Sequence, residues 1–115
     1  MTVAEITHAI REFRDARDWR QFHNPKDMAM AISIEASELL EQFLWRSPSE
    51  CEARVAEQRD KIGDELADIG IYLFELADLL GYDLLSEMNR KLGQNAAKYP
   101  VHKARGSNAK YDELS

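Results

Sequence analysis

The most apolar stretches of this chain also carry acidic residues, and this combination limits the folds that it can adopt. Residues 34–43 read IEASELLEQF, which places Glu35, Glu38 and Glu41 among large apolar side chains. Residues 62–80, IGDELADIGIYLFELADLL, show the same mixture. A buried, unpaired carboxylate is unfavourable because the ionised group loses its hydration. The fold must therefore expose these acids or gather them around a compensating cation.

Two pairs of acids stand at a spacing that places both members on one face of a helix. Glu35 precedes Glu38 by three residues, and Glu65 precedes Asp68 by three. Residues at this spacing lie roughly 5–6 Å apart at Cβ. The segment between Glu38 and Glu65 holds 26 residues, enough to end one helix, turn, and return antiparallel. The pattern predicts four carboxylates that converge between two packed helices.

A divalent cation best compensates such a group. Four carboxylates in an apolar setting cannot all stay ionised unpaired, and all-oxygen, carboxylate-rich sites suit Mg²⁺ or Mn²⁺. We therefore predict a Mg²⁺ site, with Mn²⁺ as a substitute, for which Glu35, Glu38, Glu65 and Asp68 are candidate ligands. Acids at this spacing also occur on solvated helix faces. Glu41 lies three residues after Glu38, so spacing alone does not select the ligand pair.

Three further acids read as surface or capping charges, and other metal centres are disfavoured. The three are Asp64, Glu75 and Asp78. A di-iron bundle needs Glu-x-x-His pairs, and no histidine follows one of the four predicted ligands by three residues. Zinc is disfavoured by a single cysteine and scattered histidines. The sequence has no glycine-rich phosphate loop and no G-x-S-x-G nucleophile motif.

Composition indicates a small all-α protein. The chain has 115 residues with five glycines and three prolines, and it lacks the alternating pattern of strands. Its net charge of −6 argues against broad nucleic-acid binding, which needs a basic surface. No stretch of about 20 residues is free of charge, so we expect no membrane span. The lone Cys51 and the lack of a recognisable signal peptide lead us to expect a cytoplasmic protein.

The apolar pattern and the capping signals predict four helices, over residues 3–22, 25–45, 48–80 and 83–98, with a break near Gly63 as an option in the third. Asn24 with Pro25, and Ser47 with Glu50, are typical helix starts. The second helix is apolar almost all round, which indicates a central helix with several neighbours. We expect residues 1–100 to form the helical domain and residues 101–115 a tail that is loose or draped over a partner.

Polar residues of the fourth helix are candidates for binding phosphate. Lys91 and Asn95 share a face, and Lys98 lies one turn further. A lysine pairs with phosphate oxygens and an asparagine amide donates to them. The same three residues also fit an ordinary solvated face.

Aromatic residues near the acids are candidates for binding a nucleoside. Tyr72 lies four residues after Asp68, and Trp19, His23 and Trp45 flank the ends of the first two helices. Such residues usually belong to a core or an interface, but beside a metal–phosphate site they can stack on a base.

These residues form a pattern that resembles a known family. Glu35-x-x-Glu38, followed after 26 residues by Glu65-x-x-Asp68, is similar to the signature of the all-α nucleoside triphosphate pyrophosphohydrolases of the MazG-like group. The stretches RDWRQFHNPKDMAMAISIEASELLEQFLW, DELADIGIYL and KLGQNAAKYPVHKARGSNAKYDEL resemble the dCTP pyrophosphatase branch. The resemblance covers roughly residues 13–114.

The resemblance implies an enzyme that hydrolyses a deoxynucleoside triphosphate between its α and β phosphates, for control or sanitation of the nucleotide pool. It implies a four-helix bundle that assembles as a dimer or a dimer of dimers, with Mg²⁺ held by the four acids. Glu38, or Glu35 as second choice, activates water. By position, the remaining roles fall to Lys91, Asn95 and Lys98 at the phosphates and to Trp19, His23, Trp45 and Tyr72 around the nucleoside, some from a neighbouring subunit.

Two departures leave the base preference open. Ile10 stands where some relatives carry a histidine, and the connection between the second and third helices is shorter than in animal relatives. Two alternatives therefore remain: a relative that acts on dUTP, dUDP or phosphoribosyl-ATP, and a non-catalytic helical interaction module.

Overall fold

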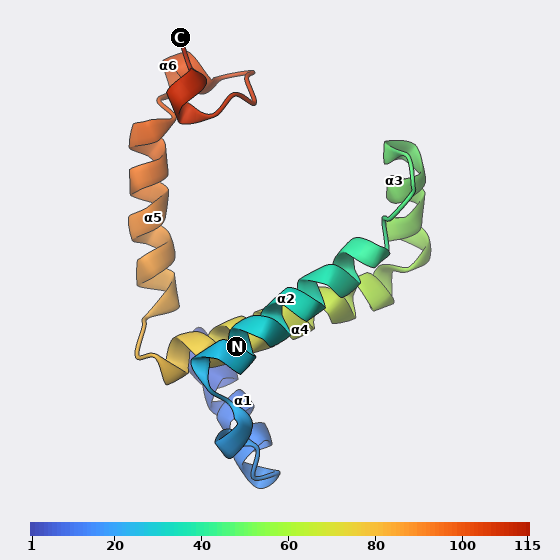
Figure 1. Ribbon diagram of the computed structural model, residues 1–115, viewed down its shortest axis with the longest axis vertical. Coiled ribbons are helices and arrows are strands. Elements are labelled where there is room, and N and C mark those ends of the chain that lie inside the picture. The colour runs from blue at the N-terminus through green and yellow to red at the C-terminus, as the bar shows by residue number, and fades with distance from the viewer. The chain divides into compact units, whose positions relative to one another are not determined.

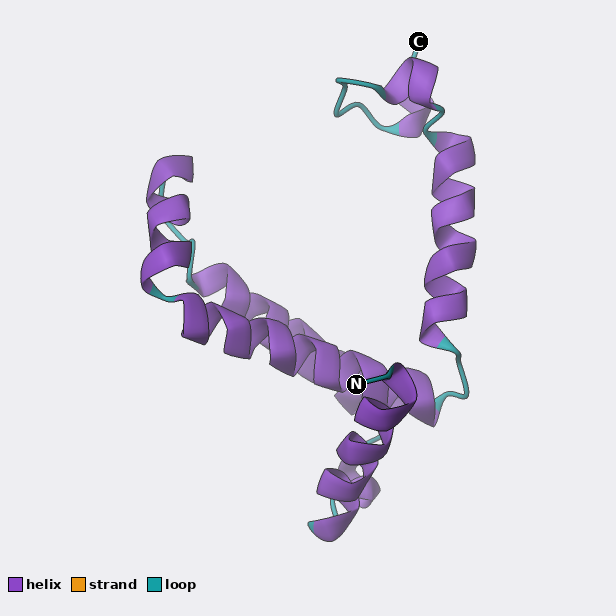
Figure 2. Ribbon diagram, turned by 180° about the vertical axis from the view of Figure 1, so that it is seen from behind, coloured by secondary structure: helices purple, strands orange, loops and turns teal.

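The computed structural model describes all residues from 1 to 115, and every regular element in it is a helix (Figures 1 and 2). The α helices are α1 (Val3–Ala16), α2 (Pro25–Glu41), α3 (Pro48–Glu57), α4 (Arg59–Leu79), α5 (Leu84–Lys98) and α6 (Val101–Ala104). Two 3₁₀ turns, Arg20–Phe22 and Tyr111–Glu113, complete the set. The prediction of an all-α chain is confirmed.

The chain divides into two compact units, residues 1–81 with α1 to α4 and residues 82–115 with α5 and α6. In the first unit α2 and α4 lie side by side and antiparallel, as both ribbon views show. Met28 of α2 is the most deeply buried large side chain, with 2% exposed. The core therefore follows the line where α2 meets α4.

The helix α1 packs on the C-terminal half of α4. Ile10 is buried, and the Arg11 guanidinium makes a two-pronged ion pair with Asp78, in which Nε lies 2.7 Å from Oδ2. This Asp78 was expected to be a surface or capping charge, and it is instead a cross-helix partner. This ion pair joins α1 to the C-terminal end of α4, beyond Glu65 and Asp68.

The predicted helix starts are confirmed by their caps. The Asn24 side chain accepts a hydrogen bond from the Asp27 backbone N–H, with Pro25 in the first turn. Ser47 and Glu50 form a reciprocal capping box at the start of α3. These bonds satisfy backbone donors that a helix start leaves without partners.

The prediction of four helices is wrong in number, because the predicted third helix is two helices and the predicted tail contains α6. The break falls at Gln58, where φ is −117° and ψ is 35°, and not near Gly63, which lies inside α4. The polar α3 buries none of its residues. It turns aside, and Arg54 donates a 3.2 Å hydrogen bond to the buried Gln42.

The first two helices also end earlier than predicted, because residues in left-handed backbone conformations follow them. Asp18 has φ of 54° after α1, and Trp45 has φ of 61° after α2. A helix cannot continue through such a residue. The segment between Ala16 and α2 is therefore a turn that carries Trp19 and His23.

The predicted tail has local structure of its own, and its being loose or draped over a partner stays a prediction. Residues 101–115 contain α6 and a 3₁₀ turn, and Tyr111 packs edge-on against Tyr99 at 6.3 Å between ring centroids. The Lys98 ammonium lies 4.9 Å from the Tyr111 ring centroid, a favourable cation–π distance. These contacts fold the tail against the end of α5, while the predicted boundary at residue 100 stays a prediction.

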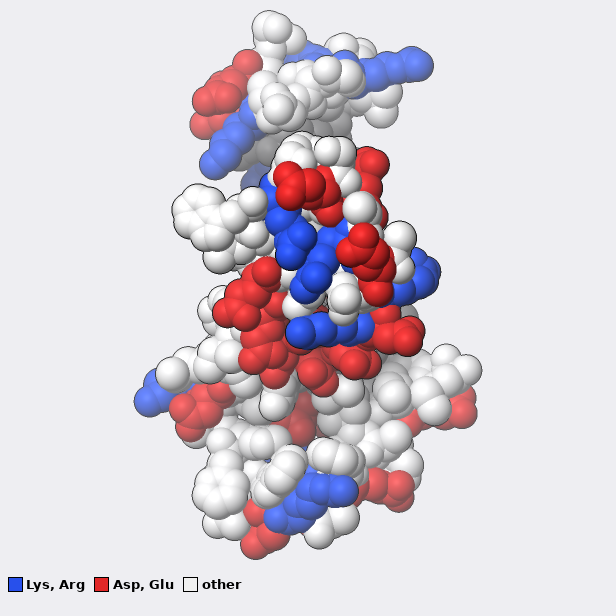
Figure 3. Space-filling model, turned by 90° about the vertical axis from the view of Figure 1, so that its right-hand side faces the viewer, with Lys and Arg blue, Asp and Glu red and all other residues white.

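The exposed surface mixes charges of both signs. On the face drawn in Figure 3, basic and acidic side chains lie next to one another and are interspersed with uncharged ones. Every helix is too short or too polar to span a membrane.

The capping box gives a first test of the fold. Replacing Ser47→Ala removes the acceptor for the Glu50 N–H and is expected to lower the free energy of unfolding by about 1 kcal/mol. Ser49→Ala is the control, because Ser49 lies inside α3 and bonds to no backbone group. Chemical denaturation followed by circular dichroism measures both, and equal losses would show that the cap is not formed.

Candidate metal and nucleotide site

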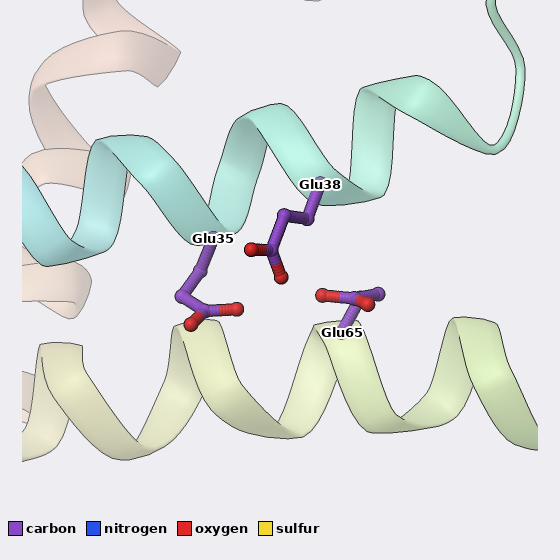
Figure 4. Close-up of side chains that lie close together, drawn as sticks. All are labelled: Glu35, Glu38 and Glu65. Carbon is purple, nitrogen blue, oxygen red and sulfur yellow. The ribbon is translucent and has the colours of Figure 1, made fainter.

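Three of the four predicted metal ligands meet between α2 and α4. Glu35 and Glu38 extend from α2 toward α4, and Glu65 extends from α4 toward α2 (Figure 4). One carboxylate oxygen from each of the three lies within 4.8 Å of the others, and all three side chains are half-buried. The i, i+3 spacing and the antiparallel pairing of the two helices together produce this convergence.

Asp68 stands one turn along α4 from Glu65 and is more exposed than the other three. It lies outside the tight cluster, but its negative charge is among the causes that raise the pKa of Glu35 and of Glu65. The set of four is therefore three converging carboxylates with a fourth at the rim. Glu41 is exposed and belongs to neither group.

The surroundings of Glu35 and Glu65 disfavour ionisation of these two carboxyl groups. Desolvation, followed by the charge of Glu38, raises the pKa of Glu35 to about 6. The pKa of Glu65 is also raised, first by desolvation and then by the neighbouring Glu38. Tyr72, one turn beyond Asp68, has a raised pKa from desolvation and then from Glu35. Negative charge without a neutralising partner is thus concentrated at this point.

The donor set fits a hard divalent cation. The Oε2 atoms of Glu35 and Glu65 are buried and have no hydrogen-bond partner, so each retains lone pairs for a ligand. All the available donors are carboxylate oxygens, the type that Mg²⁺ and Mn²⁺ prefer. The cluster could hold such an ion, which would offset both the desolvation and the mutual repulsion.

A pocket of about 430 Å³ continues from the acids along α1 and α4. Asp68 and Tyr72 connect it to the cluster, since both line it. Its other walls come from the turn after α1 and from the facing sides of α1 and α4: Ile6, Ala9, Ile10, Phe13, Arg14, Trp19, His23, Ile71 and Glu75. The lining is mainly apolar with a few polar groups, which is typical of a small-molecule site.

The pocket gathers three of the four residues predicted to surround a nucleoside. Trp19, His23 and Tyr72 line it, and Trp19 packs edge-on against Phe13 at 5.8 Å between ring centroids. Trp45 does not line this pocket. It lies in the turn after α2 with 93% of its surface exposed, so its predicted contact with a nucleoside would require another subunit.

Two charged residues of the pocket were missed by sequence reasoning. Glu75 was expected to be a surface or capping charge, but it is 4% exposed, and Arg14 is 7% exposed. Their positions along the helices could have revealed them. Glu75 stands seven residues after Asp68, and Arg14 stands four residues after Ile10. Both positions therefore fall on the inner faces of their helices.

The residues predicted to bind phosphate belong to the second unit. Lys91, Asn95 and Lys98 all lie on α5, and the two lysines are exposed. Their helical spacing is as predicted, and their role at the phosphates stays a prediction.

Comparisons with known proteins identify the family. The MazG-like family matches residues 30–114. The chain belongs to the MazG-like family. It is 38% identical to mouse dCTP pyrophosphatase 1, in an alignment that covers 98% of this chain and 68% of the mouse protein. The human protein of the same name is 36% identical over the same shares.

A solved structure supports the same assignment. The crystal structure of a pyrophosphatase from Archaeoglobus fulgidus is similar with a TM-score of 0.82 and 40% sequence identity, covering 84% of this chain and 91% of the archaeal one. Together these matches confirm the predicted family and the predicted enzyme class, a nucleoside triphosphate pyrophosphohydrolase. A non-catalytic helical module is therefore no longer a competing interpretation.

The raised pKa of Glu35 predicts how stability depends on pH without divalent cations. The folded protein holds the proton up to about pH 6, against 4.5 for the ordinary group. The stability that this proton provides is full below pH 4.5 and is lost as the pH rises through 6. Glu35→Gln removes the titration, so its Tm is expected to exceed that of the wild type by a few degrees at pH 7.5 and to match it near pH 4.

Glu41→Gln is the matched control for this pH series. It removes the same charge from α2 at a position outside the cluster. An equal gain in Tm from both variants would show that the effect comes from the net charge of −6 and not from the cluster. Thermal unfolding in EDTA-containing buffers at several pH values measures the difference.

Proposed function

We propose that this MazG-like protein hydrolyses a deoxynucleoside triphosphate of the dCTP type to the nucleoside monophosphate and pyrophosphate, with Mg²⁺ as cofactor. The observation that carries the proposal is the position of the carboxylate cluster of Glu35, Glu38 and Glu65, next to a pocket lined by Trp19 and Tyr72. The names of the similar proteins, dCTP pyrophosphatase 1 and a pyrophosphatase, support it. The reaction would serve control or sanitation of the nucleotide pool.

The four acids divide the work of holding a cation. Glu35, Glu38 and Glu65 supply the converging oxygens, and Asp68 adds charge at the rim nearest the pocket. A bound Mg²⁺ supplies neutralisation of the triphosphate charge and polarisation of the phosphoryl group. Without a bound cation the carboxylates keep the site negative. A bound cation would offset this charge, so that the acidic protein could accept an anionic substrate.

Glu38 is our choice for the group that activates water. Its carboxylate lies between those of Glu35 and Glu65 in Figure 4, and it contributes to the raised pKa of both neighbours. In the proposed step Glu38 accepts a proton from a water molecule, and the water oxygen bonds to the α-phosphorus. The bond from the α-phosphorus to the bridging oxygen breaks, and pyrophosphate leaves. Glu35 is the second choice for this role.

The nucleoside would occupy the pocket beside Asp68 and Tyr72. The Trp19 and Phe13 rings offer an apolar surface against which a base can stack. Lys91, Asn95 and Lys98 of α5 would bind the phosphates, with Lys91 stabilising the leaving pyrophosphate.

We also propose that the protein acts as a dimer or a dimer of dimers. Large apolar side chains of α2 and α4 remain exposed, among them Ile34 at 56% and Leu66 at 56%. Gly63 and Gly70 share a stripe with Leu66, and a Cβ at either glycine would meet no atom within 4 Å. Such a face allows close approach of another helix. Assembly of this kind could bring Trp45 of a neighbouring subunit to the nucleoside.

The substrate assignment and the cluster are tested by one assay. Wild-type protein is expected to release pyrophosphate from dCTP only with Mg²⁺ or Mn²⁺, and Glu38→Gln to lower kcat at least about 100-fold. Glu41→Gln, which removes a neighbouring carboxylate of the same helix, is expected to retain wild-type activity. An active Glu38→Gln with an inactive Glu35→Gln would reassign the base to Glu35.

A panel of dCTP, dUTP, dUDP and phosphoribosyl-ATP, with products identified by chromatography, separates the alternatives within the superfamily. Turnover of phosphoribosyl-ATP or dUDP in preference to dCTP would overturn the assignment of the substrate. It would leave the role of the carboxylates intact.

Self-association is tested by placing a charge on the apolar face. Wild-type protein is expected to show at least twice the 13.2 kDa of one chain by light scattering, and Leu66→Glu to shift it toward the monomer. Arg59→Glu, an exposed position at the start of the same helix, is the control and keeps the assembly. A wild-type mass of one chain at every concentration would contradict the proposal.

A further inference from the structure

We propose that Arg14 and Glu75 read the edge of the nucleobase and select one in which an amino group adjoins an unprotonated ring nitrogen, as in cytosine or adenine. The inference rests on the proposed function, because it assigns residues to the base of that substrate. It concerns two side chains that the carboxylate cluster does not use. Both line the pocket beside Asp68 and Tyr72.

Arg14 presents a hydrogen-bond donor that the protein leaves without a partner. The side chain is buried, with 7% of the residue exposed. Asp15 accepts from Nε at 2.8 Å and from Nη2 at 3.2 Å, which fixes the plane of the guanidinium. The remaining Nη1 is buried and has no hydrogen-bond partner.

An unpaired, buried guanidinium N–H is an exception that calls for a ligand. Buried donors are nearly always paired. An unpaired one is unfavourable because it has lost its hydrogen bonds to water without gaining others. Deprotonation does not remove this unpaired donor, because the hydrogen bond with Asp15 raises the pKa of Arg14 further. An acceptor atom of a molecule in the pocket would satisfy Nη1.

Glu75 presents an acceptor in the same pocket. It is 4% exposed, and its Oε2 lies 2.6 Å from Nδ1 of His23. The two atoms are in ion-pair contact, although their alignment is not that of a hydrogen bond. His23 therefore holds one side of the carboxylate in place, and we assign His23 as a positioning residue for Glu75. A carboxylate oxygen can accept from an amino group but, while ionised, cannot donate.

A donor from Arg14 and an acceptor from Glu75 in the same pocket can discriminate between bases. Cytosine and adenine each have a ring nitrogen that accepts, which suits Arg14, next to an amino group that donates, which suits Glu75. Uracil and hypoxanthine have a carbonyl oxygen in place of that amino group and an N–H in place of the ring nitrogen. The carbonyl would face the carboxylate with no proton between them, and that mismatch is unfavourable.

The test compares matched substrates that differ only at this edge, dCTP with dUTP and dATP with dITP. For the wild type, kcat/KM is expected to be at least about tenfold higher for the amino member of at least one pair. Glu75→Gln is expected to lower that ratio several-fold, because an amide can donate to a carbonyl as well as accept from an amino group, while Arg14 still opposes a base with a ring N–H. The pair that shows the effect distinguishes a cytosine reader from an adenine reader.

Two neighbouring residues provide controls. Asp78→Asn alters an acid one turn along α4, and Arg11→Gln alters an arginine one turn back along α1. These two residues pair with each other and do not line the pocket. Both control variants are expected to keep the wild-type ratio, whereas Arg14→Gln is expected to raise KM for the amino substrate. Circular dichroism checks that each variant is folded.

A binding arm separates failure of this inference from failure of the proposed function. Dissociation constants for dCMP, dUMP, dAMP and dIMP are measured by calorimetry on the wild type and on Glu75→Gln. If the wild type and Glu75→Gln both hydrolyse triphosphates with the same kcat/KM ratio between amino and carbonyl substrates, the role of Arg14 and Glu75 is overturned. The proposed function then still stands. Selective binding that Glu75→Gln weakens, without any hydrolysis, would support the reading of the base and overturn the proposed function. Equal binding of all four by the wild type, without hydrolysis, would overturn both.

Discussion

The mutual repulsion of three carboxylates is the constraint on which this structure depends. Glu35, Glu38 and Glu65 approach within 4.8 Å because the packing of α2 beside α4 turns these positions toward one another. Apolar burial therefore holds the acids together, while their charges oppose the packing that positions them. A cation that the cluster accepts would remove this opposition, so loading the site and stabilising the helix pair would be the same event.

Much of this arrangement follows from local rules that the sequence makes visible. The spacing of the two acid pairs specifies a common face, and the caps at Asn24 and Ser47 specify where α2 and α3 begin. The break at Gln58 was not predictable in this way. No glycine or proline marks it, and α3 buries none of its residues, so neither a local signal nor a buried stripe locates the break.

The charged residues of the pocket show the same limit. A glutamate or an arginine in a helix is usually solvated, so local reasoning placed Glu75 on the surface. Its burial depends on α1 crossing α4, and on His23 arriving from the turn that follows α1. That turn exists because Asp18 adopts a left-handed conformation, which the periodicity of the sequence did not reveal. Residues that read a ligand are hard to find for this reason, since contacts between distant segments decide their surroundings.

The two polar groups of the first unit differ in their balance of charge, and this difference suits the two ends of a nucleotide. The cluster around Glu38 is wholly negative, so it calls for a cation and, through it, an anionic triphosphate. The pocket instead contains groups of both signs, with Arg14 bonded to Asp15 and Glu75 in contact with His23, so that its wall offers hydrogen-bond direction as well as charge. A neutral base with a donor beside an acceptor complements such a wall. The chain would then bind its substrate by charge at one end and discriminate it by hydrogen bonding at the other.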